Sequence, residues 1–269
     1  MSSEPIEDLH FAPIFRGDTL SLALSRHQHY LFSWLGLKPG MHVLHVGCGH
    51  GTPAIELANF AKVFVVGTDD DPVKIQSAKR NATRTQISDR VSFIEVGIKN
   101  LGDTFSLQSF DAIFAIESLK VSPSFNSVYA SLGCLLKPGG TLAMYEWCWT
   151  SNFDQANVEH RRLVEMLEVE TFIGRRAPNE RTVDCAIEAI RHADLQLLHH
   201  EDLASRRVAL PWYSCLEGAL SNHGTGPRII LGSLANTSDL SNSGAAVICE
   251  AGRVNLFTPM AFFVAKRTI

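Results

Sequence analysis

A glycine-rich segment carries the clearest chemical signal in this sequence. Residues 43–53 read V-L-H-V-G-C-G-H-G-T-P, with an apolar strand predicted over residues 42–46 and a helix predicted after the glycines. Glycine lets the backbone bend sharply and approach a ligand closely, and a helix N-terminus offers unpaired N–H groups to an anion. The motif alone suits NAD, another nucleotide or only a tight turn. The candidate cofactor-binding residues here are Gly47, Cys48, Gly49 and Gly51.

An acidic residue after the next predicted strand narrows the choice. Asp69 follows the apolar residues 63–66 and lies eighteen positions after Gly51. A carboxylate there can accept both ribose hydroxyls of an adenosine, each bond contributing ~1.5–3 kcal/mol in a dry site. We place Asp69 and the adjacent Asp70 at the ribose, and we interpret Asp71 as the N-cap of a helix that begins at Pro72. This spacing fits both NAD and S-adenosylmethionine.

Strands alternate with helices along the chain and place these residues at one edge of a sheet. Strands are predicted over residues 42–46, 63–66, 91–96, 110–116, 141–147, 195–198 and 256–265. Helices are predicted over residues 19–35, 53–60, 72–84, 124–136, 157–173 and 181–192, with a turn over 137–140 and loops over 221–243 around a short element at 229–231. The alternation predicts an α/β fold with a parallel, doubly wound sheet.

Composition excludes several functions. The net charge of −4 in 269 residues gives no basic footprint for a nucleic acid. The polar, acidic start lacks a secretion signal, and no run of eighteen apolar residues predicts a membrane span. The six cysteines have no C-x-x-C spacing, and we expect no metal site. We therefore expect a reduced, cytoplasmic protein with no nucleic-acid partner; peripheral membrane contact and a homodimer are left open.

Several longer segments resemble the sterol C-methyltransferase family of class I S-adenosylmethionine-dependent enzymes. They are HFAPIFRGDTLSLALSRHQHYL (10–31), VGCGHGTPA (46–54), VVGTDDDPVKIQSAKRN (65–81), LKPGGTLAMYEW (136–147), EDLA (201–204), LPWY (210–213) and LFTPMAFFVAK (256–266). The resemblance implies a Rossmann-like sheet of seven strands with the last strand antiparallel, under a helical cap. It divides a single globular domain into a cap segment (1–40), a cofactor-binding core (41–150) and a C-terminal part that completes the sheet and covers the acceptor (151–269).

The resemblance also implies roles for single residues. Gly47, Cys48 and Gly49 would line the methionine end of S-adenosylmethionine, and Asp69 its ribose. Gly97, Ile98 and Lys99 would flank the adenine. Ile116 and Glu117, at the end of the fourth strand, would border the reaction centre.

Three positions depart from the family pattern. His45 stands where the family has an aspartate that contacts the cofactor ammonium, and Ile98 replaces an acid beside the adenine. Gln28 replaces the glutamate of the family's R-H-E-H-Y segment. These changes predict weaker cofactor binding and an acceptor other than a sterol.

Methyl transfer from a sulfonium needs alignment, exclusion of water and a base. Glu117 is the first candidate base because it ends a strand at the expected crevice, with a surface glutamate as the alternative. His29 and Glu146 are the other candidates; a packed histidine and a paired strand residue are their alternatives. Aromatic residues could form an apolar wall or only core, namely Phe11, Phe15, Tyr30, Trp147, Trp149, Trp212 and Tyr213.

These observations predict an S-adenosylmethionine-dependent methyltransferase. Its partner would be a lipophilic small molecule (sterol-like, terpenoid or another specialised metabolite), with S-adenosylhomocysteine as the second product. An alternative hypothesis is an enzyme with the same fold that catalyses a cyclisation or rearrangement without methyl transfer. S-adenosylmethionine would then be a structural cofactor or would be absent. A non-catalytic binding subunit and an NAD dehydrogenase are further alternatives, which the motifs above disfavour.

Overall fold

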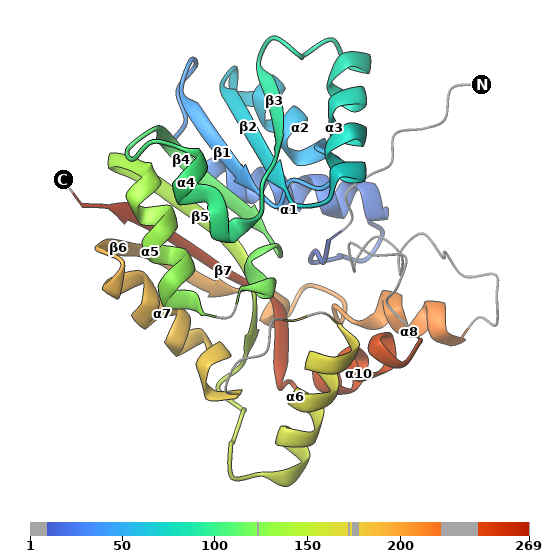
Figure 1. Ribbon diagram of the computed structural model, residues 1–269. Coiled ribbons are helices and arrows are strands. Elements are labelled where there is room, and N and C mark those ends of the chain that lie inside the picture. Colours follow the sequence, from blue (N-terminus) through green and yellow to red (C-terminus); the bar gives the residue numbers. More distant parts are fainter. Residues whose placement is uncertain (1–9, 123, 172, 174–177, 222–241, 269) are drawn as a thin grey trace.

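A single mixed sheet organises the molecule. Figure 1 shows the computed structural model, which describes residues 10–122, 124–171, 173, 178–221 and 242–268. Within these residues seven strands pair in the order β3-β2-β1-β4-β5-β7-β6. They are β1 (His42–Val46), β2 (Phe64–Asp69), β3 (Val91–Glu95), β4 (Phe110–Ile116), β5 (Leu136–Trp149), β6 (Leu195–Asp202) and β7 (Phe257–Arg267). Strands β1, β2, β3, β4 and β5 run parallel to their neighbours, while β7 runs antiparallel to both β5 and β6. The predicted seven-stranded α/β fold is confirmed.

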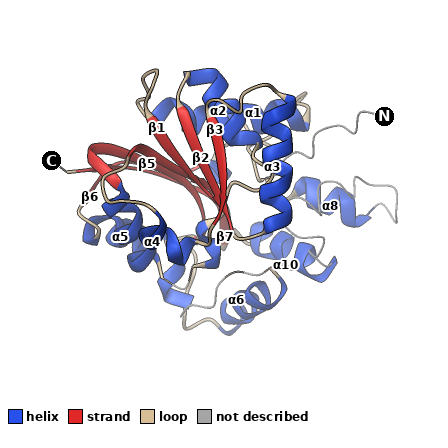
Figure 2. Cartoon of the chain, turned by 45° about the horizontal axis from the view of Figure 1, so that its top comes forward, coloured by secondary structure: helices blue, strands red, loops and turns tan. Residues whose placement is uncertain are grey.

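Helices cover both faces of the sheet (Figure 2). One face packs against α1 (Leu20–Trp34), α2 (Thr52–Ala61) and α3 (Pro72–Arg84). The other packs against α4 (Leu101–Thr104), α5 (Phe125–Leu135) and α7 (Val183–His192). Around the end of β5 and the start of β7 lie α6 (Val158–Glu170), α8 (Ser214–Ser221) and α10 (Asn242–Arg253), at the lower right of Figure 1.

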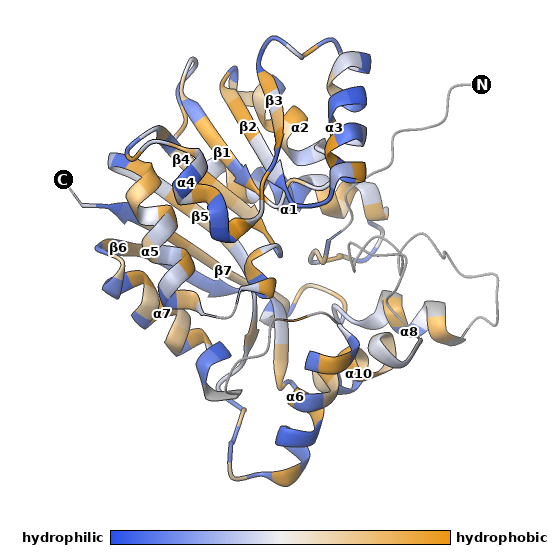
Figure 3. Ribbon diagram, in the orientation of Figure 1, coloured by the Kyte–Doolittle hydropathy of each residue, from blue (hydrophilic) through white to orange (hydrophobic). Residues whose placement is uncertain are grey.

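The strands are apolar on both sides because helices bury both faces. On β4, Ala112 and Phe114 join the core under α1 to α3, while Ile113 and Ala115 join the core under α5 and α7. Figure 3 shows the result as orange central strands and blue outer surfaces on helices such as α3. Short polar caps set the helix starts: the side chains of Thr19, Asp71 and Ser124 accept backbone N–H bonds at α1, α3 and α5.

Two predictions about local structure are corrected. Residues 137–140 lie inside β5 and not in a separate turn: Phe110 pairs with Leu136 and Ala112 with Thr141, so the four residues bulge out of the ladder between these pairs. Gly139 allows this bulge with a left-handed φ of +76°. Helices α8 and α10 were not predicted, and the element proposed at residues 229–231 lies outside the described residues.

The described part of the chain holds no helix with the length and apolar character to cross a membrane. No disulfide bond joins the five cysteines whose side chains are described, namely Cys48, Cys134, Cys148, Cys185 and Cys249.

Candidate active site

The glycine turn after β1 is shaped by close contacts. Gly47, Gly49 and Gly51 all have left-handed φ values of +54° to +86°. A Cβ on Gly47 would lie 2.2 Å from the Cβ of Ser118, whose hydroxyl donates a hydrogen bond of 2.6 Å to the Val46 carbonyl. The turn after β1 therefore touches the turn after β4, and only glycine permits that approach.

Gly51 serves packing as well as the turn. A Cβ there would lie 2.6 Å from the Phe93 ring and 2.9 Å from the Cβ of Ala78. This glycine lets α2 approach α3 and β3. Cys48 is buried, and its backbone N–H donates to the Thr68 carbonyl at 2.7 Å, which fixes the turn to the end of β2.

Asp69 ties the glycine turn to the next strand. Its carboxylate is 6% exposed; Oδ2 accepts from the Gly49 N–H at 3.0 Å and Oδ1 from the Asp71 N–H at 3.1 Å. A carboxylate has about four lone-pair sites, so capacity for further donors remains. Asp70 is exposed, and Asp71 caps α3 as predicted by accepting from the Val73 N–H at 2.8 Å.

The remaining predicted cofactor residues lie at the same edge of the sheet. Gly97 follows β3, and a Cβ on it would lie 3.6 Å from the Cβ of Asp70. Ile98 begins a short 3-10 helix, half-buried against the core beside α5, while Lys99 is exposed. Ile116 is the half-buried last residue of β4. The carboxyl ends of parallel strands meet at this edge of the sheet, and the role of these residues in cofactor binding stays a prediction.

Glu117 lies just beyond β4 and joins three segments. Its backbone N–H donates to the Tyr145 carbonyl at 3.0 Å, and its φ of +55° is left-handed. Oε1 accepts from the Phe11 N–H at 2.6 Å and Oε2 from the Trp147 indole at 3.0 Å. The side chain is 5% exposed, and this burial raises the pKa of Glu117 to about 7 despite those two donors and the neighbouring Lys120.

An aromatic cluster surrounds this carboxylate. Phe11 packs edge-on against Trp147 and Trp212, with ring centroids 5.9 and 5.2 Å apart, and Trp147 packs against Phe257 at 5.3 Å. Lys120 Nζ lies 3.7 Å from the centroid of the Trp147 ring. Tyr30 is separate from this cluster, since it packs against Trp34 and Phe262. Of the aromatic residues predicted to form an apolar wall, Phe11, Trp147 and Trp212 therefore lie beside Glu117, whereas Tyr30 packs in the core elsewhere.

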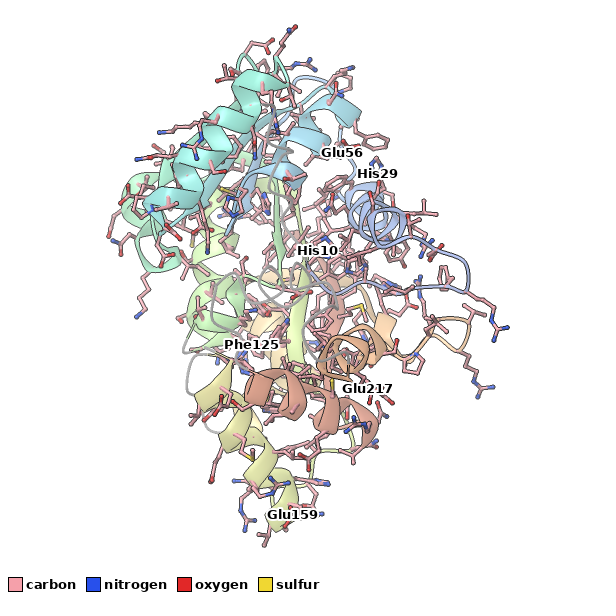
Figure 4. The ribbon with its side chains drawn as sticks, turned by 90° about the vertical axis from the view of Figure 1, so that its right-hand side faces the viewer. His10, His29, Glu56, Phe125, Glu159 and Glu217 are labelled. Atoms are coloured by element: carbon pink, nitrogen blue, oxygen red, sulfur yellow. The ribbon has the colours of Figure 1, made fainter. Side chains whose placement is uncertain are left out.

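The structure does not bring His29 to this site. Its Nε2 lies 2.9 Å from Glu56 Oε1 of α2, and its ring packs edge-on against the exposed Phe60. Figure 4 shows His29 and Glu56 side by side, away from His10. Residues two positions apart on a helix face different directions. His27 is therefore buried in the core, whereas His29 lies nearer the surface.

Glu146 is fully buried on β5, and its Oε1 accepts from the Tyr129 hydroxyl of α5 at 3.1 Å. Trp147, the next residue, belongs to the core on the opposite face of the sheet. Glu146 is therefore fixed by its hydrogen bond to α5, although its negative charge still acts to raise the pKa of Lys120.

Three buried histidines beneath the glycine turn were not grouped by sequence reasoning. The rings of His10 and His27 are 5.3 Å apart, His27 stacks on Tyr145 at 3.7 Å, and His45 stacks on Phe114 at 4.0 Å. Burial lowers the pKa of His45 to about 3 and of His10 to about 4, so both imidazoles are neutral. A cationic His45 is therefore disfavoured.

Neutral His10 explains the glutamine at position 28. His10 Nδ1 lies 2.9 Å from the Phe11 carbonyl oxygen and must donate to it, which leaves Nε2 as an acceptor. Gln28 Nε2 lies 3.1 Å from that atom and donates. A carboxylate at position 28 could not donate, so Gln28 suits this hydrogen bond better than the family's glutamate.

Comparison with known proteins agrees with this geometry. The family described as "Methyltransferase domain" matches residues 37–195. The sterol 24-C-methyltransferase of Neurospora crassa is 33% identical over 287 residues, which cover 97% of this chain and 74% of the relative. The chain belongs to the sterol C-methyltransferase-like family of class I methyltransferases. It is an S-adenosylmethionine-dependent methyltransferase, as the sequence predicted.

Solved structures confirm the fold of this methyltransferase. The geranyl diphosphate C-methyltransferase of Streptomyces coelicolor A3(2) superposes with a TM-score of 0.76 at 16% identity, covering 99% of this chain and 94% of the other. The cyclase SpnF superposes with a TM-score of 0.71 at 22% identity, covering 98% and 89%. At these identities the likeness concerns the fold alone.

Proposed function

We propose that this methyltransferase transfers the methyl group of S-adenosylmethionine to a lipophilic small molecule and leaves S-adenosylhomocysteine. Sterol-like, terpenoid and other specialised metabolites are the acceptor classes considered. The observation that carries the proposal is the aromatic cluster of Phe11, Trp147 and Trp212 around Glu117, next to the glycine turn. The name of the relative that is 33% identical, a sterol 24-C-methyltransferase, supports a lipophilic acceptor.

The residues present fit the cofactor. Gly47, Cys48, Gly49 and Gly51 would hold its methionine end, because their turn leads into the N-terminus of α2 and has no room for a side chain at positions 47 and 51. Asp69 would accept the ribose hydroxyls with its remaining lone pairs, with Asp70 beside it. Gly97, Ile98 and Lys99 would flank the adenine, and Ile116 would border the methyl group. When bound, the cofactor supplies an electrophilic methyl group on a sulfonium.

Glu117 is the candidate general base. A carboxyl whose pKa burial raises to about 7 can both take and release a proton near neutral pH. Its two protein donors, the Phe11 N–H and the Trp147 indole, hold it in one orientation. Glu146, which α5 holds on the other face, would act on Lys120 through its charge and not as a base.

Calorimetric titration with S-adenosylmethionine and S-adenosylhomocysteine tests the proposal. We expect micromolar binding of both ligands. Asp69→Ala should weaken binding at least tenfold, because ~1.5–3 kcal/mol per charged hydrogen bond corresponds to about tenfold or more. Asp103→Ala, an exposed aspartate on α4, is the matched control and should leave affinity unchanged.

The titration also decides between the two enzymatic hypotheses. Binding that Asp69→Ala removes, followed by methylated products from lipophilic acceptors, supports the methyltransferase. Absence of binding at millimolar ligand would contradict it. The chain would then be assigned to a cyclisation or rearrangement without the cofactor.

A further inference from the structure

Lys120 is a buried cation whose surroundings are unusual. It lies in the short 3-10 helix Leu119–Val121, three residues after Glu117, and is only 7% exposed. Its ammonium group lies over the face of Trp147. Within the described residues, Nζ has no hydrogen bond to an acceptor and no ion pair with a carboxylate. Lysine is almost never buried without a partner. Among the described residues no acceptor atom contacts this ammonium directly, although Glu117 and Glu146 act on it through their charges.

Charges of both signs act on this ammonium from neighbouring elements. Glu117 after β4 and Glu146 on β5 are negative, while Arg181 before α7 and Lys74 on α3 are positive. Arg181 is itself 1% exposed and donates to the Lys120 carbonyl at 2.8 Å. Lys74 is paired with Asp71 at 3.9 Å, so Arg181 is the buried cation that accompanies Lys120 here.

Both Glu117 oxygens and the Oε1 atom of Glu146 accept hydrogen bonds from other groups. Glu117 accepts from the Phe11 N–H and the Trp147 indole, and Glu146 accepts from the Tyr129 hydroxyl. Burial lowers the pKa of Lys120 to about 8, so the group stays mainly protonated at neutral pH. The Trp147 face compensates part of the lost hydration by cation–π attraction.

We propose that Lys120 binds an anionic oxygen of the acceptor. The acceptor is then a lipophilic molecule with an acidic oxygen: an enol, a phenol or a carboxylic acid. This inference rests on the proposed function, because it takes the aromatic cluster beneath Lys120 as the acceptor site.

The chemistry separates this acceptor from a sterol alkene. Methylation of a neutral alkene leaves a positive charge on the acceptor, which a fixed ammonium would repel. An acidic hydroxyl instead loses its proton to the Glu117 carboxylate and leaves an oxyanion paired with Lys120. Glu117 and Lys120, three residues apart, would thus take the proton and hold the resulting charge.

Binding of three probes with the same ten-carbon chain tests the inference. Decanoate, decan-1-ol and decylammonium are titrated into the full chain by calorimetry, with and without S-adenosylhomocysteine. Wild-type protein should bind decanoate at least tenfold more tightly than the other two. Lys120→Met keeps a long side chain but removes its charge. This variant should lose the preference for decanoate and should still bind decan-1-ol. Lys120→Arg should keep part of the preference for decanoate. Lys79→Met, which replaces an exposed lysine on α3, should leave the affinities for all three probes unchanged.

Two results would overturn the inference: wild-type protein that does not prefer the acid, or an unchanged preference in Lys120→Met. Thermal melting identifies a variant that fails to fold, and Lys120→Arg then supplies the comparison. Failure of the proposed function is read separately, from the absence of S-adenosylmethionine binding and of methylated products while the acid preference persists.

Discussion

The glycine turn and the Glu117 region lie at the same edge of the sheet but are assembled from different contacts. The turn depends on backbone: three left-handed glycines, a helix N-terminus and the Asp69 carboxylate receiving two N–H bonds. The Glu117 region depends on side chains from distant segments, since Phe11 and Glu117 are 106 positions apart and Trp147 and Glu117 are 30 apart. A local motif can therefore specify the first region, whereas the second exists only once the whole sheet and the N-terminal segment are in place.

The largest effect should come from breaking the backbone-built region. Gly47→Ala combines an unfavourable left-handed φ with a contact of 2.2 Å to the Ser118 Cβ. We expect the free energy of unfolding to fall by about 3 kcal/mol or more, and S-adenosylhomocysteine affinity to fall more than tenfold. Denaturant titration and calorimetry measure these effects.

Gly139→Ala is the matched control for that substitution. Its φ is also left-handed at +76°, but a Cβ there would meet only the Lys266 side chain at 3.8 Å. The control should cost about 1–2 kcal/mol of stability and leave ligand affinity unchanged. Equal losses in both variants would mean that the contact between the two turns has no special role.

A smaller, pH-dependent effect should mark the region built from side chains. Because burial raises the pKa of Glu117 from 4.5 to about 7, the stability contributed by its protonated form is present below pH 4.5 and lost as pH rises through about 7. Glutamine does not ionise, so the Glu117→Gln variant does not undergo this pH-dependent loss of stability. The unfolding free energy of the variant relative to wild type should therefore rise by about 3 kcal/mol between pH 4.5 and 7.5.

Denaturant titrations of both proteins across this range measure the change. Glu95→Gln, at the exposed end of β3, is the control and should show no such trend. A pH-independent difference between Glu117→Gln and wild type would show that Glu117 ionises at its ordinary pKa, and its role as base would lose its support.

The smallest effect concerns the two departures from the family pattern beside the cofactor. Restoring acids with His45→Asp and Ile98→Asp should tighten S-adenosylmethionine binding about tenfold, since a charged hydrogen bond contributes ~1.5–3 kcal/mol. Stability should fall, because His45 gives up its stacking on Phe114 in a buried position. Calorimetry separates the two effects, with each single variant as a control. Unchanged or weaker affinity would contradict the placement of both residues beside the cofactor.

The sequence was most informative where structure is local. Alternating apolar strands and helices predicted the sheet, and the glycine run with Asp69 and Asp71 predicted one complete turn and one helix cap. The bulge at residues 137–140 was taken for a turn, because glycine and proline mark both features. Helix α10 was missed because its first residues belong to the Gly-, Ser- and Asn-rich stretch 221–243, which was predicted to form loops.

The site was less predictable because burial depends on tertiary contacts. Glu117 could be placed at a strand end, but its contact with Phe11 could not. His27 and His29 look equivalent in sequence, yet only His27 is buried. Lys120 was overlooked, although an acid and a lysine three residues apart directly after a strand is a signal that could have found it. The domain boundaries, the cytoplasmic location and a homodimer stay predictions.

The position of β7 has a consequence for synthesis on the ribosome. This strand comes last among the described strands, yet it lies between β5 and β6 and pairs with both. While the chain is being made, β6 lacks its neighbour β7, and β5 keeps one edge of unpaired backbone N–H and C=O groups. The nascent chain therefore carries an incomplete sheet until residues 257–267 leave the exit tunnel. We expect chaperone contact to persist until that moment and then to be released in a single step.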